Sequence, residues 1–310
     1  MAGLYSTTVT PTERRKAFRD GLTSGNIQRF PGAFSPLVAR AIQEAGFDGV
    51  YVSGAVVAAD LALPDIGLTT LTEVAHRSRQ IARVTDLPVL VDADTGFGEP
   101  MSAARTISEF EDAGVAGCHL EDQVNPKRCG HLDGKEVVPT ELMLRRITAA
   151  VNERRDDQFI ICARTDAAGV EGIDSAIERA KAYADAGADL IFTEALHTPA
   201  DFEKFRAAVD VPLLANMTEF GKSELLSAQQ LEELGFNAVI YPVTTLRIAM
   251  GQVEEALAEI AATGTQTGWV DRMQHRSRLY ELLRYNEYNA FDQQVFTYSA
   301  DNYQPTFTQP

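Results

Sequence analysis

One pattern recurs four times along this chain of 310 residues and limits the folds that it can adopt. In each copy a helix-like segment ends in Gly and an apolar run follows: EAGFDGVYVSG (44–54), DAGVAGCHLED (112–122), DAGADLIFTEA (185–195) and ELGFNAVIYPV (233–243). Glycine just after a helix readily adopts the left-handed conformation that ends it. Each copy therefore predicts a helix, a tight turn and a strand.

Four further segments complete a set of eight predicted strands. DLPVLVDAD (86–94) and DVPLLANMT (210–218) share a Pro before a short apolar run, and IQRFPGA (27–33) and FIICART (159–165) are similar runs. Helical spacing of apolar residues lies between them, as in 139–155 and 172–187. Eight alternating units favour a closed (β/α)8 barrel of the TIM type, as one domain over residues 1–310. The alternative is an open doubly wound sheet, but its GxGxxG sequence after the first strand is absent, because those positions read GAFSP (32–36).

The C-terminal part of the chain contains more helix than a barrel requires. Residues 245–264 are predicted to form the eighth helix, and residues 269–291 form one helix more. The spare apolar face of that segment predicts packing on a neighbouring subunit, and therefore an oligomer.

Composition excludes several classes of function. A formal net charge of −16 repels nucleic acid and anionic membranes, so neither is an expected partner. No segment has eighteen apolar residues, and the N-terminus lacks the apolar core of a signal peptide. Three cysteines without a CxxC pair predict a reducing, cytoplasmic setting. An acidic substrate would need local cations or a metal to overcome the net charge.

Polar residues gather at the ends of the predicted strands. In a parallel barrel the active site lies at the carboxyl ends of the strands, and residues two apart share a face. Polar residues also mark places where strands reach water. That explanation is sufficient for one or two strand ends, but polar residues occur here at seven of the predicted strand ends. We therefore expect these side chains to converge at one mouth: Tyr51, Ser53, Asp92, Asp94, His119, Glu121, Arg164, Asp166, Glu194, Asn216, Thr218 and Tyr241.

The carboxylates among them suggest a metal site. Asp92, Asp94 and Glu121, with Asp65 after the second strand, are hard oxygen ligands of the kind that Mg²⁺ takes, often through retained waters. Zinc is disfavoured because its potential ligands Cys118 and His119 are adjacent and face opposite sides of their strand. Asp65 follows Pro64 and is also consistent with a turn residue.

The segment NPKRCGH (125–131) places a thiol on a predicted loop after the fourth strand. Lys127 and Arg128 favour the thiolate of Cys129 or make the thiol a better acid. Gly130 allows a ligand to approach the backbone, and His131 can donate to an anion or relay a proton. The alternative is a solvated basic loop with an incidental cysteine.

Several arginines point to a substrate with carboxylate groups. Two of them are Arg128, on the loop, and Arg164, at a strand end. The other two are Arg247, at the start of the eighth helix, and Arg276, on the extra helix. Arginine binds carboxylates with two parallel hydrogen bonds. Together with a metal site in an acidic protein, they predict a small substrate with two or three carboxylates.

The sequence resembles the 2-methylisocitrate lyases of the isocitrate lyase/phosphoenolpyruvate mutase superfamily. KRCGH (127–131) is similar to their signature, whereas true isocitrate lyases usually read KKCGH and the mutases and decarboxylases lack the Cys. Collinear matches extend over about residues 14 to 290 and include YVSGA (51–55), LPDIGL (63–68), VDADTGFG (91–98), LEDQ (120–123), ARTDA (163–167), ANMTEFG (215–221) and YPVTTLR (241–247).

The resemblance implies Mg²⁺-dependent cleavage of the tricarboxylate 2-methylisocitrate to pyruvate and succinate, in the methylcitrate cycle of propionate breakdown. It also implies a homotetramer, a dimer of dimers, in which C-terminal helices swap between barrels. Isocitrate cleavage, an oxaloacetate-type decarboxylase and a non-catalytic binding protein are the alternatives.

The resemblance also implies roles for the matching residues. Asp92 would bind Mg²⁺ directly, while Asp65, Asp94 and Glu121 would hold its waters. The residues that would bind substrate are Ser53, Gly54, Ala55, Lys127, Arg128, Gly130, His131, Arg164, Glu194, Asn216, Thr218, Arg247 and Arg276.

The proposed chemistry needs one acid and one base. Cys129 is the candidate acid for the carbanion left by the cleavage, because a thiol of tuned pKa is suited to proton donation. The base that takes the 2-hydroxyl proton is Asp65, Tyr51 or a metal-bound water. Phe192 and residues 240–242 are the candidate wall around the extra methyl group.

Overall fold

The computed structural model describes residues 4, 7–128, 130 and 134–297. The chain divides into two compact units, Thr7–Glu254 and a second unit made of Met1–Ser6 with Glu255–Pro310. None of the helices in the described part of the chain has the length and apolar character needed to cross a lipid bilayer.

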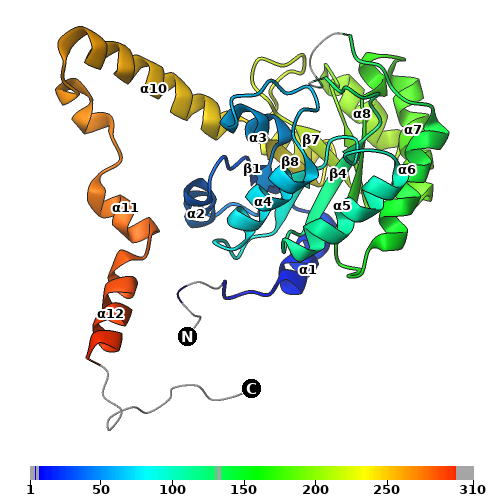
Figure 1. Ribbon diagram of the computed structural model, residues 1–310. Helices are drawn as coiled ribbons and strands as arrows, with labels where there is room; N and C mark the ends of the chain where they lie inside the picture. The colour runs from blue at the N-terminus through cyan, green and yellow to red at the C-terminus, as the bar shows by residue number, and fades with distance from the viewer. Residues whose placement is uncertain (1–3, 5–6, 129, 131–133, 298–310) are drawn as a thin grey trace. The chain divides into compact units, whose positions relative to one another are not determined.

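The first unit is built on a single sheet of eight parallel strands (Figure 1). The sheet runs in the order β1-β8-β7-β6-β5-β4-β3-β2. Its two outer strands meet through a parallel bridge between Gly32 and Tyr51, and the Ala33 amide donates to the Tyr51 carbonyl at 2.9 Å. The strands are β1 (Gln28–Pro31), β2 (Val50–Val52), β3 (Val89–Asp92), β4 (Gly117–Glu121), β5 (Ile160–Thr165), β6 (Leu190–Thr193), β7 (Leu213–Asn216) and β8 (Ala238–Tyr241). The predicted (β/α)8 barrel is confirmed in a nearly closed form, and the alternative of an open doubly wound sheet is wrong.

Helices surround the strands and alternate with them along the chain (Figure 1). They are α1 (Pro11–Leu22), α2 (Pro36–Glu44), α3 (Gly54–Asp60), α4 (Leu71–Ala82), α5 (Pro100–Asp112), α6 (Thr140–Glu153), the 3₁₀ turn η1 (Ala167–Gly169), α7 (Ile173–Asp185), α8 (Pro199–Ala208) and α9 (Ala228–Glu233). Helix α10 (Thr244–Thr263) follows β8, and its residues from Glu255 on belong to the second unit. The four predicted turn glycines, Gly46, Gly114, Gly187 and Gly235, all have left-handed φ angles, of 75°, 78°, 103° and 82°. The repeated sequence pattern therefore marks helix ends, as predicted.

Apolar side chains fill the inside of the barrel at the amino ends of the strands. Alternate strand residues point inward because successive side chains face opposite sides of a strand. Helix α1 adds Phe18 and Leu22 to this cluster, and the rings of Phe18 and Phe30 lie 4.8 Å apart. A separate, larger apolar cluster joins strands to the surrounding helices, and it includes Val91 of β3, Ile107 of α5 and Ile161 of β5. The interior packing leaves the carboxyl ends of the strands as the place where polar side chains gather.

The second unit differs from its prediction. Residues 269–291 were expected to form one helix, but they belong to the 3₁₀ segment η2 (Thr267–Arg272), α11 (Arg276–Leu282) and α12 (Tyr285–Phe296). His275 is extended and caps α11, and Arg284 between α11 and α12 has a φ of 56°. A right-handed helix cannot continue through a left-handed residue, so the single-helix prediction is wrong.

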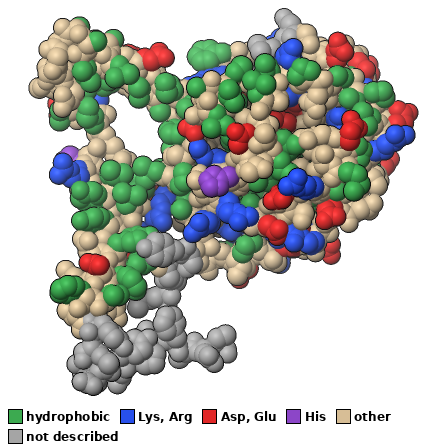
Figure 2. Space-filling model, in the orientation of Figure 1, with side chains coloured by type: hydrophobic (Ala, Val, Ile, Leu, Met, Phe, Trp, Pro, Cys, Tyr) green, Lys and Arg blue, Asp and Glu red, His purple; other side chains and the backbone are tan. Residues whose placement is uncertain are grey.

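Large apolar side chains are exposed along the helices of the second unit. Figure 2 shows them in green on these helices, and they include Leu257, Val270, Phe291 and Val295. Large apolar side chains exposed in such numbers on one segment are consistent with a protein–protein contact.

Candidate active site

Most of the polar residues predicted to converge lie together at the carboxyl ends of the strands. Tyr241 does not, because it faces the opposite side of β8 from Ile240 and packs against the larger apolar cluster. Seven of the twelve line a cavity of about 80 Å³. Its lining includes these predicted residues: Tyr51, Ser53, Ala55, Asp65, Asp92, Lys127, Arg128, Gly130, Arg164, Glu194, Asn216, Thr218 and Arg247. The cavity is smaller than the roughly 300 Å³ or more that small-molecule sites typically enclose, so a tricarboxylate needs some of these side chains to shift.

The predicted residues Gly54, Asp94 and Glu121 lie beside the cavity and contact Asp92, Lys127 and Arg164, respectively. Three others are not placed at the cavity. Cys129 and His131 lie outside the described residues. Arg276 is the first residue of α11, in the second unit, so its assignment to the substrate stays a prediction.

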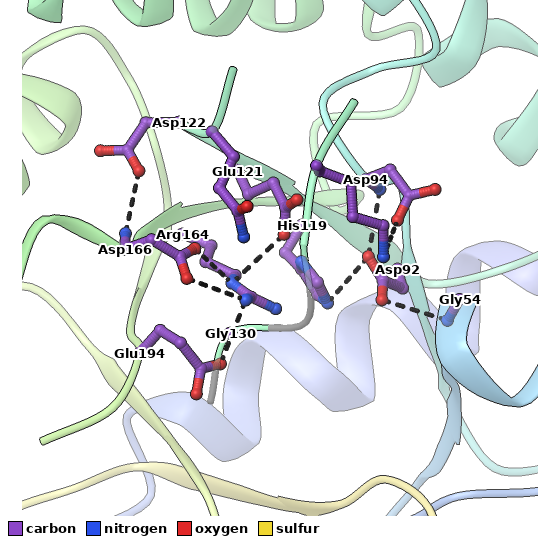
Figure 3. Close-up of polar contacts among 12 residues, drawn as sticks. Gly54, Asp92, Asp94, His119, Glu121, Asp122, Gly130, Arg164, Asp166 and Glu194 are labelled. Atoms are coloured by element: carbon purple, nitrogen blue, oxygen red, sulfur yellow. Dashed lines mark hydrogen bonds and ion pairs between the residues drawn. The ribbon is translucent and has the colours of Figure 1, made fainter. Parts of the chain in front are cut away.

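Asp92, which ends β3, and Asp94 lie together on one side of the site (Figure 3). Asp92 accepts hydrogen bonds from the backbone amides of Gly54 at 3.1 Å and Asp94 at 3.0 Å. The ammonium of Lys127 pairs with Asp94 at 2.8 Å and also with Asp65. Asp65 is therefore part of the site and not only a turn residue.

These carboxyl groups have shifted pKa values that follow from burial and neighbouring charge. Burial opposes ionisation of Asp92, but interactions with His119, Lys127 and Arg164 outweigh it and lower its pKa. Burial, followed by the charge of Asp92, raises the pKa of Asp94 to about 6. Burial also raises the pKa of Glu121 well above its usual range. A group of carboxylates that resist joint ionisation gains from an added cation.

The donor atoms of the four carboxylate side chains predicted as ligands fit Mg²⁺. All four predicted ligands offer carboxylate oxygens, and the buried Oε1 atom of Glu121 has no hydrogen-bond partner. A Cβ atom on Gly54 would lie 3.0 Å from Asp92 Oδ2 and 3.1 Å from Asp94 Oδ1, so glycine keeps the space beside these oxygens free. Within the described ranges, no three His, Cys, Asp or Glu side chains form a ready-made metal-binding group. Such a group is not required if Mg²⁺ has one direct carboxylate ligand and the other carboxylates bind its water molecules.

Arg164 is the cationic centre of the opposite side (Figure 3). Its guanidinium donates to both oxygens of Asp166, at 2.8 and 3.1 Å. It also lies 3.3 Å from Glu121 and 3.5 Å from Glu194. Burial opposes its charge, but these carboxylates raise the pKa of Arg164 well above its usual value. Arg164 is therefore a permanent buried cation.

Tyr51 and His119 form a hydrogen-bonded pair in the middle of the site. The Tyr51 hydroxyl lies 2.7 Å from His119 Nε2, and that nitrogen lies 3.7 Å from Asp92 Oδ1. Burial lowers the pKa of His119 to about 4, despite the nearby carboxylates. Burial, followed by the charge of Asp92, raises the pKa of Tyr51 well above its usual value. Both groups are neutral near pH 7, so Tyr51 is suited to donate a proton rather than to accept one.

The far wall combines amide, hydroxyl and cationic groups. The Asn216 side-chain amide donates to Glu194 at 3.2 Å. Arg247 donates to the Thr218 hydroxyl at 3.4 Å and pairs with Glu219 at 2.8 Å, and its guanidinium lies 5.3 Å from the centre of the Phe220 ring. These donors can hold a carboxylate on the side away from Asp92.

The loop that follows β4 reaches the site through backbone contacts. Gln123 holds Arg128 by accepting from its amide and donating to its carbonyl, both at 2.8 Å. A Cβ atom on Gly130 would lie 2.3 Å from Arg164 Nη2 and 2.5 Å from Glu194 Cγ, so only glycine fits at this point. The close approach of a ligand to the Gly130 backbone stays a prediction.

Sequence reasoning missed the roles of four residues. His119 was expected at the mouth, but its bond to Tyr51 was not. Gln123 and Glu219 lie within the matching segments LEDQ and ANMTEFG, which is the signal that could have drawn attention to them. Lys135, which pairs with Asp166 at 2.9 Å, carried no signal.

Comparison with known proteins gives the family. The model of the phosphoenolpyruvate phosphomutase family matches residues 18–261. The chain is 86% identical over 307 residues to a probable 2-methylisocitrate lyase 2 of Corynebacterium glutamicum, covering 99% of this chain and 100% of that protein. It is 44% identical over 275 residues to a 2-methylisocitrate lyase of Escherichia coli K12, covering 88% and 93%.

Solved structures agree in fold. Oxaloacetate acetylhydrolase in complex with 3,3-difluorooxalacetate has a TM-score of 0.87 at 33% identity, covering 94% of this chain and 99% of that chain. A 2,3-dimethylmalate lyase has a TM-score of 0.85 at 32% identity, covering 97% and 100%. Phosphonopyruvate hydrolase in complex with oxalate and Mg²⁺ has a TM-score of 0.84 at 28% identity, covering 92% and 99%. The chain therefore belongs to the 2-methylisocitrate lyase family of the phosphoenolpyruvate mutase/isocitrate lyase superfamily.

Proposed function

We propose that this chain cleaves 2-methylisocitrate into pyruvate and succinate. The observation that carries the proposal is that one cavity joins two chemistries: carboxylates suited to a hard cation, and cationic or amide groups suited to carboxylates. The names of the relatives in Corynebacterium glutamicum and Escherichia coli support it.

We propose Mg²⁺ as the cofactor, with Asp92 as its direct ligand and with Asp65, Asp94 and Glu121 holding its waters. The Mg²⁺ in the related phosphonopyruvate hydrolase structure supports this assignment. When bound, the ion would supply the positive charge that stabilises negative charge on the 2-oxygen of the substrate.

The pyruvate-forming part of the substrate binds at the β2 and β5 ends. Ser53 and Ala55 line the cavity there, and Gly54 is fixed against Asp92 by its amide. Arg164 receives the carboxylate of this part, since its charge is permanent and its guanidinium reaches the cavity.

The succinate-forming part binds along the far wall and the loop. Glu194, Asn216, Thr218 and Arg247 line this side of the cavity, with Lys127, Arg128 and Gly130 above it. We assign His131 and Arg276 to the same part of the substrate by family resemblance alone.

Cleavage needs proton transfer at two atoms. We assign the removal of the 2-hydroxyl proton to Asp65 rather than to Tyr51, because burial raises the pKa of the Tyr51 hydroxyl well above its usual value. A metal-bound water is the remaining alternative. The O–H electron pair becomes the carbonyl π bond of pyruvate, and the broken C2–C3 bond leaves its pair on C3. Cys129 donates its proton to C3, which completes succinate and leaves a thiolate that nearby cations stabilise.

The methyl group of the substrate packs against apolar residues of the same cavity. Phe192, Ile240 and Pro242 line it, and Phe192 and Ile240 are buried. A pocket of this type discriminates one methyl group by about 1–3 kcal/mol.

We also propose the setting of the reaction. The two compact units together form one functional domain of residues 1–310, and four chains form a dimer of dimers with exchanged C-terminal helices. The exposed apolar side chains of the second unit support this assembly.

The reaction takes place in the cytoplasm, on propionate-derived carbon, where a catalytic thiol stays reduced.

The purified chain with Mg²⁺ should convert 2-methylisocitrate to equal amounts of pyruvate and succinate, measured by product chromatography. With isocitrate, the kcat/KM for glyoxylate formation should be roughly 10- to 200-fold lower, because the methyl pocket is left unfilled. Dominant glyoxylate formation would favour an isocitrate lyase, and neither product would end the lyase proposal.

Removal of the metal should abolish activity and Mg²⁺ should restore it. Calorimetric titration should give one site per chain, weakened at least roughly tenfold in Asp92→Asn, because a direct carboxylate ligand is lost. Asp112→Asn, on the surface of α5, is the matched control and should bind as the parent does. Full activity after chelation, or unchanged Mg²⁺ affinity in Asp92→Asn, would contradict this assignment.

Sedimentation equilibrium should give a mass of four chains. Leu257→Asp places a charge on the exposed apolar surface of α10 and should lower that mass, whereas Met101→Asp on α5 should not. A single-chain mass for the parent would overturn the proposed tetramer.

A further inference from the structure

Lys135 joins the loop backbone to the ion pair of Arg164. Its side chain is only 4% exposed, and its ammonium pairs with Asp166 Oδ1 at 2.9 Å. The same ammonium donates to the carbonyl of Gly130. A buried ammonium that makes two such bonds, one to the backbone, fixes the distance between its partners.

Asp166 is shared between Lys135 and Arg164. It is completely buried, and it accepts from the Arg164 guanidinium through both of its oxygens. Its backbone amide is held in turn by Asp122 Oδ1 at 2.9 Å. Asp166 is therefore a fixed point to which both cations are attached.

Gly130 is attached to the same group from its other side. The missing side chain of Gly130 brings its backbone against Arg164 and Glu194, while its carbonyl accepts from Lys135. Arg128 lies two residues before Gly130, and Gln123 binds both its backbone amide and its carbonyl. The backbone is thus held at residue 128 by Gln123 and at residue 130 by Lys135.

We propose that Lys135 is a positioning residue, which holds the backbone at Gly130 in register with Arg164 and so sets the loop against the bound carboxylate. The inference rests on the lyase function proposed above. Lys135 lies outside the lining of the substrate cavity, so it acts through Gly130 and Asp166 and not on the substrate itself.

The alternative is a purely structural role, in which Lys135 only neutralises Asp166. That role predicts lower stability with unchanged turnover per folded chain. A positioning role predicts a lower kcat with a small change in KM, because misplacement of about 1 Å costs roughly 100-fold in rate.

The test compares Lys135→Met with Lys181→Met, which removes an exposed lysine paired with Glu178 on α7. In Lys135→Met, kcat should fall roughly 10- to 100-fold while KM changes less than about threefold. Without substrate, trypsin should cut after Lys127 or Arg128 at least several times faster than in the parent, followed by mass spectrometry. Lys181→Met should match the parent in both readouts.

Lys135→Arg is the second variant, in case Lys135→Met does not fold. It keeps a cation for Asp166, but its longer side chain displaces Gly130, so kcat should still fall and cleavage should still quicken. A parent-like kcat in either folded variant would overturn the proposal, even if cleavage by trypsin quickens, because faster cleavage alone also fits the purely structural role. The tryptic comparison needs no substrate, so failure of the lyase assay and failure of the Lys135 inference are separate results.

Discussion

The guanidinium of Arg164 meets three buried carboxylates where β5 ends, and the geometry of the site depends on this contact. Asp166 binds it through two hydrogen bonds, and Glu121 and Glu194 lie 3.3 and 3.5 Å away. Buried carboxylates are costly unless a cation accompanies them. Because Glu121 ends β4 and Glu194 follows β6, Arg164 holds three neighbouring strand ends together. Lys127 plays a similar part between Asp65 and Asp94.

The barrel could be predicted from the sequence because its signals are local. A glycine with a left-handed φ ended each of the four repeated helices, and the apolar runs after them became strands. The extra helical segment could not be predicted in the same way. It breaks at the extended His275 and again at Arg284, whose left-handed backbone has no sign in the residue type.

The membership of the site was predictable, but its contacts were not. The two-residue period of strands placed Asp92 and Arg164 at the same mouth, as observed. The bonds from Lys127 to Asp65 and from Lys135 to Asp166 depend on the path of a loop, and no periodicity describes that path. The substrate itself came from the resemblance of KRCGH and its companion segments, since the arginines and carboxylates alone indicate only a carboxylate-rich ligand.

The proposed mechanism requires that the thiol of Cys129 donate the proton that completes succinate. Turnover and substrate binding of Cys129→Ser test this requirement, with Cys118→Ala, a change at a buried cysteine, as the control. The predicted result is a fall in kcat of roughly 10²- to 10⁴-fold, with the fold and substrate affinity kept and with parent-like kcat in the control. A Cys129→Ser protein that is folded and turns over 2-methylisocitrate as fast as the parent would contradict it.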